Sequence, residues 1–424
     1  MTQHNNYIDR IQEKKLTELF SHFPVLVVTG ARQVGKSTVL SHLFPEPIRR
    51  VVFDPLEDIE GARRDPDLFL ANNRTPIILD EIQYVPTLSG AIKRLLEKDR
   101  SPSQYILTGS QQWSMIKNLS DSLAGRAVFF DMNGLSLQEA ARINTASPNA
   151  GSGSWLKRWI SWDTREPMQH SSFPRMSLPH SPFEHIWRGW LPEAQFLPTH
   201  LIPSFHQSYQ RTYIERDIRY MGEINDWSQF GRFIRLCAAM TGQEINHSQI
   251  GRDIGITPQT SARWLSLLKA AYQWYEIPAF SNNPTKRISQ KPKGYLSDSG
   301  LVCYGLSLSS PTALSGHPSW GHIFEATIVD QVKKMGSVLD LAPTFYHWRS
   351  HGGAEVDLIL ELDGRFYPIE IKSKSHVSSG DCRGIAAFRE TYPKLNIAPG
   401  LVIYLGETFQ QITAYDYAMP WDAY

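Results

Sequence analysis

The 424-residue sequence has few cysteines, almost no net charge and no long apolar run. Its three cysteines, Cys237, Cys303 and Cys382, lie far apart, which excludes a disulfide framework and a thiolate zinc site. The 43 basic and 42 acidic residues give a net charge of +1, which excludes a globally basic nucleic-acid coat and an acidic disordered tail. No apolar run is long enough for a membrane span, and the polar first residues lack the apolar core of a signal peptide. We therefore expect a cytoplasmic protein of several domains.

Short apolar runs divide the first third of the chain, at residues 24–30, 49–54, 76–81 and 105–110. Continuous apolar runs of this length are typical of strands that are covered on both faces, and the segments between them are long enough for crossover helices. Residues 1–144 are thus predicted to form an α/β domain with a parallel sheet, whose ligands bind beyond the carboxyl ends of the strands.

The strongest motif is GARQVGKST, which directly follows the apolar run VLVV and matches G-x-x-x-x-G-K-[ST] in the required strand–loop–helix context. Glycines let the backbone N–H groups face phosphate oxygens, the lysine supplies a charge at the β and γ phosphates, and the serine hydroxyl ligates Mg²⁺. The predicted ATP-binding residues are Gly30, Ala31, Arg32, Gln33, Val34, Gly35, Lys36, Ser37 and Thr38.

Further catalytic candidates follow neighbouring strands. Asp80 ends the run IILD and is predicted to hold Mg²⁺ together with Ser37, while Glu81 is predicted to activate the attacking water. Ser110, at the end of the strand predicted at 105–110, is expected near the γ-phosphate. Arg126 can neutralise charge on the transferred phosphoryl group, in its own subunit or a neighbour's, or it can be an ordinary surface arginine.

The middle of the chain differs from the first third in composition and in predicted secondary structure. Residues 145–182 are rich in Ser and Pro and form a predicted insertion or linker, in which Trp155, Trp159 and Trp162 share one helical face. This face is expected to pack on a neighbouring domain, with contact to a partner or a membrane surface as the alternative. Residues 183–308 are predicted to be helical and to include a winged helix with a basic wing, used either for DNA contact or only for packing. Its two central helices are expected to meet at the turn GIT, before Pro258, and the second helix is expected to bury Trp264, Leu265 and Leu268. The candidate DNA contacts are Arg263, Lys286, Arg287, Lys291 and Lys293.

Residues 309–424 return to strands. Asp357 in GAEVDLILEL is predicted to face away from Val356 and Leu358, and Glu370 and Lys372 in RFYPIEIKSK share one face of the next strand. Pairing of these strands brings two carboxylates and an ammonium together, and Glu325 can add a third carboxylate. Solvent-facing charge on an amphipathic hairpin explains the same alternation. His347 and His351 lie on a strand and a loop, where their spacing does not favour zinc.

The motifs occur in an order that resembles a prokaryotic family, the AAA-type P-loop ATPases fused to a DUF4143 domain (AAA_14 with DUF4143). The resemblance rests on GARQVGKST, IILDEIQ, TGS followed by SLAGR, IWRGWLPE, YIERDI, KGYLSDSGL, IFEATIV, and EVDLIL with IEIKSK. It implies a P-loop NTPase sheet, a helical and winged-helix domain, and an α/β PD-(D/E)xK nuclease-like domain. It also implies that Glu325, Asp357, Glu370 and Lys372 occupy the metal-site positions of that last domain.

We therefore expect a Mg·ATP-hydrolysing protein that couples hydrolysis to a DNA-directed activity. Metal-dependent cleavage of DNA is one form that this activity can take. The alternative is an ATP-dependent switch or scaffold whose nuclease-like domain only binds nucleic acid or protein. The cofactors expected are ATP and Mg²⁺, with a second Mg²⁺ or Mn²⁺ in the C-terminal domain if it cleaves. The partners expected are DNA and further copies of the chain. A small-molecule kinase would need a phosphoacceptor site, which the sequence does not reveal.

Overall fold

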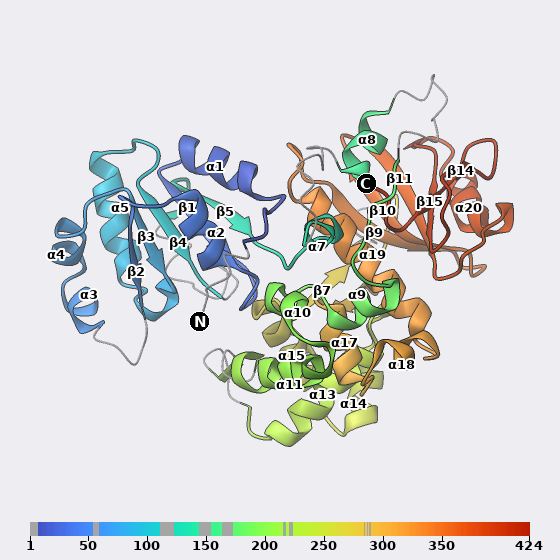
Figure 1. Ribbon diagram of the computed structural model, residues 1–424, viewed down its shortest axis with the longest axis horizontal. Coiled ribbons are helices and arrows are strands. Elements are labelled where there is room, and N and C mark those ends of the chain that lie inside the picture. Colours follow the sequence, from blue (N-terminus) through green and yellow to red (C-terminus); the bar gives the residue numbers. More distant parts are fainter. Residues whose placement is uncertain are drawn as a thin grey trace.

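The computed structural model describes residues 7–53, 59–110, 123–143, 154–162, 173–214, 218–219, 224–283, 285, 287 and 290–424. Figure 1 shows an N-terminal α/β unit on the left, a helical unit below and a mixed-sheet unit on the right. This order confirms the predicted fold class: a parallel sheet of the P-loop type, a helical middle and an α/β C-terminal unit. Within the described ranges, no helix has both the length and the apolar character needed to cross a bilayer.

The N-terminal unit is built on a five-stranded parallel sheet with the order β2-β3-β4-β1-β5. Every residue of β1, β3 and β4 is buried, as expected for strands covered by helices on both faces. The strands are β1 (Val25–Thr29), β2 (Arg49–Val52), β3 (Ile77–Asp80), β4 (Tyr105–Thr108) and β5 (Ala127–Asp131). The helices are α1 (Glu13–His22), α2 (Lys36–Leu43), α3 (Glu60–Arg64), α4 (Pro66–Ala71), η1 (Ile82–Tyr84), α5 (Leu88–Lys98) and α7 (Leu137–Ala141).

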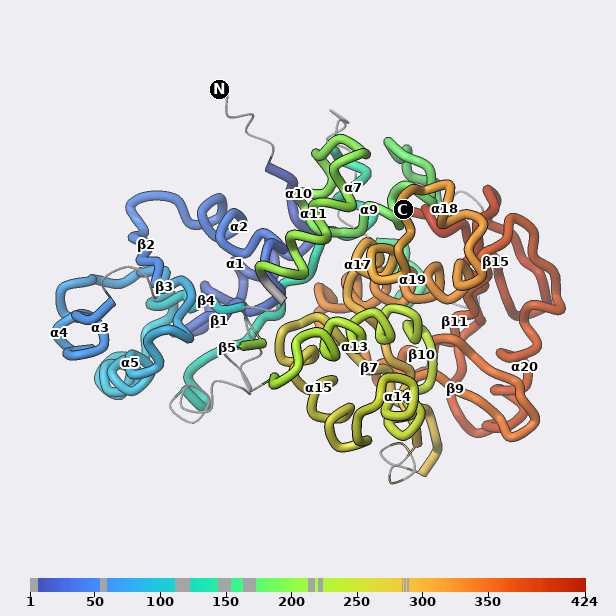
Figure 2. Tube along the Cα trace, turned by 90° about the horizontal axis from the view of Figure 1, so that it is seen from below, coloured from blue at the N-terminus to red at the C-terminus, as the bar shows by residue number. Residues whose placement is uncertain are grey.

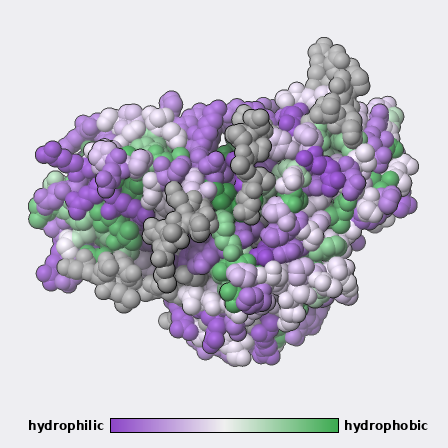
Figure 3. Space-filling view, viewed as in Figure 1, coloured by the Kyte–Doolittle hydropathy of each residue, from purple (hydrophilic) through white to green (hydrophobic). Residues whose placement is uncertain are grey.

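Strand β2 lies at the edge of this sheet, and it is the most exposed of the five strands. Val52 at its end is 49% exposed, and Leu68 on the neighbouring α4 is 57% exposed. Figure 3 shows hydrophobic surface at this end of the unit, over β2, α3 and α4. The remaining surface in that view is largely hydrophilic.

The helical unit contains a winged helix in the order helix, strand, two helices and two strands. Its three-stranded antiparallel sheet has the order β6-β8-β7. Gly255, with φ +75°, ends α14, and the Thr257 side chain caps α15, so the predicted turn lies where the sequence placed it. The elements are α13 (Trp227–Ala239), β6 (Gln243–Glu244), α14 (His247–Ile254), α15 (Pro258–Ala270), β7 (Trp274–Ile277) and β8 (Lys293–Leu296).

Several short helices precede and follow the winged helix. Trp264 of α15 packs edge-on against Phe230 and Phe233 of α13, which confirms that the predicted face of α15 is buried. Figure 2 shows α17 beside α19, and the two helices are in contact. The short helices are α9 (Pro182–Arg188), α10 (Pro192–Phe196), η4 (Thr199–Leu201), α11 (Ile202–Tyr209), η5 (Gln210–Ile214), α17 (Ser299–Gly305) and α18 (Pro311–Ser315).

The C-terminal unit has a seven-stranded mixed sheet, in which β14-β15-β13-β11-β10-β9 are consecutive neighbours and β12 also pairs with β11. Strands β9, β10 and β11 are antiparallel, and β11, β13 and β15 are parallel. The elements are α19 (Trp320–Gly336), β9 (Thr344–Arg349), β10 (Glu355–Leu362), β11 (Arg365–Lys372), η6 (Ser379–Cys382), α20 (Arg383–Thr391), β12 (Asn396–Ile397), β13 (Leu401–Tyr404), β14 (Gln410–Gln411) and β15 (Tyr417–Pro420).

A β-bulge corrects the predicted alternation on β10. The pairing with β9 shifts register between Val356 and Ile359, and these two residues pack in one core cluster while Leu358 and Leu360 pack in another. Val356 therefore does not share a face with Leu358, because the extra residue of a bulge interrupts the period of two. Asp357 lies within this bulge, which changes the direction of its side chain relative to a regular strand.

Two segments from earlier in the chain pack on the C-terminal sheet. Helix α8 (Trp155–Ser161) places Trp159 edge-on against Tyr367 of β11, and Trp162 meets Tyr417 of β15, which confirms that the tryptophans pack on a neighbouring unit. The connection between β7 and β8 also reaches this unit. Its Phe280 is buried in the cluster that contains Trp348 and Phe388, so the start of the wing is anchored in the core of the C-terminal unit.

Candidate functional site

The loop between β1 and α2 has the geometry expected of a phosphate-binding loop. Gly30 has φ +142° and Gly35 has φ +94°, values that strongly favour glycine. A Cβ atom at Gly30 would lie 2.2 Å from the carbonyl oxygen of Met132, so no larger residue fits without a shift of the backbone. Gly35 is the N-cap of α2, so the free N–H groups of the first helical turn face outward from the end of the loop.

The Lys36 side chain lies against this loop and is buried. Its Nζ donates hydrogen bonds to the carbonyl oxygens of Gly30 at 2.9 Å and of Ala31 at 2.8 Å. An anion bound by the N–H groups of the loop would therefore find a cation within reach of a small side-chain movement.

The hydroxyl of Ser37 and the carboxylate of Asp80 meet beside the loop. Ser37 Oγ donates to Asp80 Oδ2 at 2.9 Å, and Thr108 and Arg50 also donate to this carboxylate. Burial acts to raise the pKa of Asp80, but the hydrogen bonds from Thr108 and Arg50 outweigh it and lower the pKa below its usual value. An ionised carboxylate next to a hydroxyl, both at the carboxyl edge of the sheet, is an oxygen donor set that fits Mg²⁺.

Glu81 lies at the same edge, in a left-handed backbone conformation with φ +58°. Gln83 donates to its carboxylate, the Ser110 hydroxyl lies 3.5 Å from it, and Arg32 Nη1 is 3.8 Å from its other oxygen. The ends of β1, β3 and β4 therefore bring together the loop residues, Asp80, Glu81 and Ser110, as the sequence predicted for neighbouring parallel strands. The carboxylate of Glu81 is oriented by these groups, as a general base requires.

Sequence reasoning missed Arg50, which forms an ion pair with Asp80 from the adjacent strand β2. Strand β2 pairs with β3 in parallel, so that Val52 lies opposite Asp80. The sequence hints at this ion pair only through the two arginines that begin β2. They could be assigned to Asp80 only if β2 were already known to pair with β3.

Arg10 was also missed, although it braces the phosphate-binding loop. Its guanidinium is buried, forms an ion pair with Glu139 at 3.0 Å, and donates to the carbonyl oxygens of Val34 at 2.8 Å and Asn133 at 2.6 Å. It therefore ties the first described residues, the loop and α7 together. Removing one partner of such a buried pair costs roughly 3–5 kcal/mol of folding free energy. No motif in the sequence indicates this contact.

Arg126 does not lie near the loop. It directly precedes β5, whose first residue Ala127 pairs with Val25 at the start of β1, and its guanidinium lies 3.5 Å from Glu97. The phosphate-binding loop follows the opposite end of β1, about 15 Å away for five residues of strand. In this arrangement Arg126 lies at the amino edge of the sheet, away from the phosphate-binding loop of its own subunit.

The predicted acidic residues of the C-terminal unit do come together, but with an additional lysine among them. Glu325 extends from α19, Asp357 from β10 and Glu370 from β11, and all three are buried. Lys293 of β8 lies 2.8 Å from Glu325 and 3.7 Å from Asp357. Lys372 lies 2.5 Å from Glu370. We call Glu325, Asp357, Glu370, Lys372 and Lys293 the acidic cluster.

The charges of the acidic cluster depend on each other. Burial, followed by the charge of Asp357, raises the pKa of Glu325 to about 7 and raises the pKa of Glu370 well above its usual value. Burial acts to lower the pKa of Lys293, but Glu325 and Asp357 outweigh it and raise that pKa. In the described ranges, these three carboxylates do not converge closely enough to hold one ion. With the Lys293 ammonium between two of them, the cluster as arranged does not fit a divalent metal.

The basic residues predicted to contact DNA lie in different surroundings. Lys293 is only 8% exposed, so the interpretation of this residue as a surface contact is replaced by its ion pairs in the acidic cluster. Arg287 donates to Tyr346 and Glu361 of the C-terminal unit at 3.0 and 3.1 Å, so it too differs from an exposed wing residue. Arg263 and Lys291 are exposed, and Lys286 lies outside the described residues.

His347 is buried on β9, where its Nε2 lies 3.2 Å from the carbonyl oxygen of Lys291. Burial, followed by the charge of Lys293, lowers the pKa of His347 to about 4. Between this value and the unfolded value of about 6.5, the unfolded chain binds the proton more strongly, so stability is lost as the pH falls.

We expect His347→Gln to lose less thermal stability than the wild type when the pH is lowered from 6.5 to 4, because the variant lacks this titrating group. The unfolding midpoint measured by circular dichroism over that pH range tests the expectation. His376→Gln, which changes an exposed histidine, is the matched control and should follow the wild-type curve. Identical curves for His347→Gln and the wild type would contradict the assigned pKa.

Family models match three stretches of the chain. Residues 22–141 match a family described as an AAA domain (AAA_14), and residues 320–424 match a domain of unknown function, DUF4143. Between them, residues 180–312 match another domain of unknown function, DUF8612.

Two uncharacterized proteins, from Mycobacterium bovis and Mycobacterium tuberculosis, are each 26% identical over 395 residues, which cover 93% of this chain and 79% of theirs. Among solved structures, the chain resembles a Walker-type ATPase of Pyrococcus abyssi, with 17% identity, a TM-score of 0.41, and coverage of 72% of this chain and 97% of that one. The RuvB Holliday junction branch migration motor of Thermotoga maritima gives 15% identity, a TM-score of 0.29, and coverage of 64% and 90%.

Proposed function

Because the chain combines an AAA domain of the P-loop type with a DUF4143 domain, we propose that it is a Mg·ATP-hydrolysing switch. In this proposal, the nucleotide bound at the β1–α2 loop sets the arrangement of the helical and C-terminal units. The observation that carries the proposal is the Ser37–Asp80 pair, 2.9 Å apart, beside a loop with the backbone of a phosphate-binding loop. Mg²⁺ held there would neutralise charge on the β and γ phosphates.

In this proposal, the backbone and the Lys36 side chain of the loop bind the phosphates in different ways. The N–H groups of residues 30–38 bind phosphate oxygens, and Gly30 and Gly35 permit the necessary backbone curvature. The Lys36 ammonium exchanges the carbonyl oxygens of Gly30 and Ala31 for phosphate oxygens, which carry full negative charge and are stronger acceptors.

Glu81 accepts the proton of the attacking water in the proposed reaction. Gln83 and Ser110 hold its carboxylate in place, and Arg32 approaches it from the loop. Because Arg32 belongs to the loop that binds phosphate, nucleotide binding and the position of the general base are linked.

Contacts between the units support the switch. Tyr209 of α11 donates to the carbonyl oxygen of Arg32 at 3.0 Å, and Tyr272 donates to Asp131 at the end of β5 at 2.7 Å. On the other side, Lys334 of α19 donates to the carbonyl oxygen of Leu135 at 2.9 Å. A change in the loop that follows nucleotide binding would therefore reach the helical unit through the Tyr209 side chain, while Tyr272 and Lys334 join the later units to the end of β5 and the segment after it.

The acidic cluster favours a switch over a nuclease. A metal-dependent nuclease needs its carboxylates free for a cation, but Lys293 pairs with Glu325 and lies 3.7 Å from Asp357. We therefore do not assign a second Mg²⁺ or Mn²⁺ to this arrangement. DNA contact is a second candidate function, and it rests on Arg263, which is exposed on the second helix of the helix-turn-helix.

The test is phosphate release by the purified protein with ATP and Mg²⁺. We expect release that stops when EDTA removes the metal, and a rate at least about tenfold lower in Ser37→Ala, because this variant loses one oxygen ligand. Thr17→Ala, which removes an exposed hydroxyl on α1, should keep the wild-type rate. Release that is equal with and without Mg²⁺ would sink the proposal. Stimulation by duplex DNA, lost in Arg263→Ala, would support the second candidate.

A further inference from the structure

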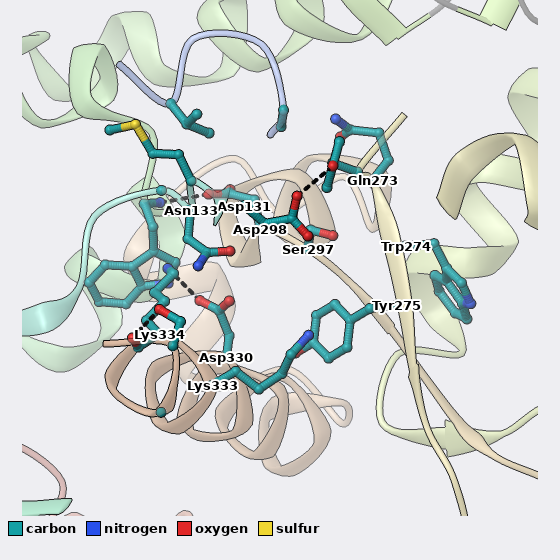
Figure 4. Close-up of a pocket in the computed structure, with 18 of the residues that line it drawn as sticks. Asp131, Asn133, Gln273, Trp274, Tyr275, Ser297, Asp298, Asp330, Lys333 and Lys334 are labelled. Atoms are coloured by element: carbon teal, nitrogen blue, oxygen red, sulfur yellow. Dashed lines mark hydrogen bonds and ion pairs between the residues drawn. The ribbon is translucent and has the colours of Figure 1, made fainter. Parts of the chain in front are cut away.

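A cavity of about 440 Å³ lies where the three units meet, next to the phosphate-binding loop. Its walls come from the loop (Ala31, Val34), the segment after β5, the turn before β7, and α19. Figure 4 shows Lys333, Lys334 and Asp330 of α19 on one side, and Asn133 and Asp131 across from them. This volume is within the range of small-molecule sites in proteins.

Lys333 enters the cavity without a counter-ion. Its Nζ lies 3.1 Å from the centroid of the Tyr275 ring, and no carboxylate in the described part of the chain lies within ion-pair distance. Figure 4 shows the Lys333 and Tyr275 side chains next to each other. The neighbouring Lys334 differs, because it pairs with Asp330 at 2.5 Å and also donates to Leu135. Burial lowers the pKa of Lys333 to about 8, with Asp330 and Asp131 acting against this and Lys334 adding to it.

Tyr275 supplies a second donor. Its hydroxyl oxygen is buried, and no hydrogen-bond partner for it occurs among the described residues. A buried hydroxyl without a partner costs about 1–3 kcal/mol, so such groups usually have a binding role or a missing partner.

The other charged groups around the cavity have partners of their own, and Asp330 has its ion pair with Lys334. Asp131 accepts hydrogen bonds from Thr29 and Tyr272. Asp298 caps α17 and accepts from the backbone N–H groups of Gly300, Leu301 and Trp190. The lysine ammonium and the tyrosine hydroxyl are thus the groups left to recognise a ligand, and both favour an acceptor with negative charge.

We infer that this cavity binds a small organic monocarboxylate, with its carboxylate on Lys333 and Tyr275 and an apolar or aromatic body against Trp190 and Phe345. A single negative charge matches the single unpaired ammonium. A phosphate dianion would also meet Asp330 and Asp131, which repel it. Since Ala31 and Val34 form part of the wall, the occupant contacts the back of the phosphate-binding loop; its influence on ATP turnover rests on the proposed function, whereas its binding does not.

The experiment is saturation-transfer NMR with a set of aromatic monocarboxylates, including benzoate and indole-3-acetate, each paired with its neutral primary amide. A non-hydrolysable ATP analogue and Mg²⁺ are present at saturation, so that the loop itself offers no anion site. We expect the carboxylates to bind at least about tenfold more tightly than their amides, because a hydrogen bond to a charged group is the stronger one. Inorganic phosphate is expected to bind more weakly than the best carboxylate.

The variants locate the site. Lys333→Met should lose about tenfold or more in carboxylate affinity, Tyr275→Phe should lose less while keeping the ring, and Lys394→Met, an exposed lysine, should lose nothing. An unfolding midpoint of Lys333→Met at or above that of the wild type shows that it folds, as expected when an unpaired buried charge is removed. Equal affinity for acids and amides, or unchanged affinity in Lys333→Met, would overturn the inference. Repeating the titration in Glu81→Gln, which is expected to bind the ATP analogue without hydrolysing ATP, separates it from the ATPase: binding retained there upholds the site even if no ATP is hydrolysed.

Discussion

Glu81→Gln should lower the rate of ATP hydrolysis by about 10²–10⁴-fold while ATP still binds. The amide keeps the size of the side chain and its contact with Ser110, but it cannot accept the proton of the attacking water. Phosphate release under single-turnover conditions measures the rate, and a fluorescent ATP analogue measures the affinity. Under this mechanism, kcat falls and the nucleotide dissociation constant changes by less than about threefold.

Two further variants separate the general base from the residues that position it. Ser110→Ala removes one contact to the Glu81 carboxylate and should lower the rate by much less than Glu81→Gln does. Lys36→Ala should abolish binding as well as hydrolysis, because it removes the loop's cation. A Glu81→Gln protein with wild-type turnover would mean that another group, such as Asp80, acts on the water.

Lys293→Met should destabilise the protein by roughly 3–5 kcal/mol at pH 7, because it leaves Glu325 and Asp357 buried without their ammonium. We also expect Mn²⁺ or Mg²⁺ to bind this variant and raise its unfolding midpoint, since a divalent ion can take the place of the missing charge. Thermal denaturation with and without each ion measures both effects. Lys291→Met, two residues earlier and exposed, should behave as the wild type does.

The same variant tests the alternative nuclease function. If a divalent ion stabilises Lys293→Met and a DNA substrate is then cleaved, the acidic cluster is a metal site that Lys293 keeps closed. Adding Asp357→Ala should then remove both the stabilisation and the cleavage. A Lys293→Met protein that is unaffected by Mn²⁺ and Mg²⁺ would show that the cluster serves only to join β8 to the C-terminal unit.

The raised pKa of Glu325 determines in which direction this group changes the folding stability as the pH rises. Its folded value, about 7, exceeds the ordinary carboxyl value, so the folded protein binds this proton more strongly than the unfolded chain does. Stability from this group is therefore full at low pH and is lost as the pH rises through the interval up to about 7. In Lys293→Met the loss should be larger, because the ammonium that favours the ionised carboxylate is gone.

The sequence was sufficient for features that depend on local pattern. The runs that became β1, β3 and β4 are apolar up to their last residue because both faces of their sheet are covered, and the loop motif requires glycine at two positions with positive φ. Parallel strands then place Asp80, Glu81 and Ser110 at one edge without further information. Thr257 and Gly255 marked the turn of the winged helix for the same local reasons.

Features that depend on contacts between distant segments could not be predicted. Lys293 looked like a wing residue because its neighbours in sequence are basic, whereas its environment is set by Glu325 and Asp357. Arg126 precedes an apolar strand, but only the pairing of that strand shows that it lies at the amino edge. The bulge at Asp357 depends on how β9 and β10 pair, which alternation alone does not encode.

The burial of Phe280 among Trp348 and Phe388 has a practical consequence for modularity. Two domains that recombine freely need boundaries that few contacts cross, but this aromatic side chain belongs by sequence to one unit and by packing to the next. A chimaera joined between the winged helix and the C-terminal unit would pair a foreign wing with a native pocket, leaving either a void or a clash. Swapping units between related proteins should therefore succeed only when the winged helix and the C-terminal unit are transferred together. The two units are expected to be inherited together in evolution.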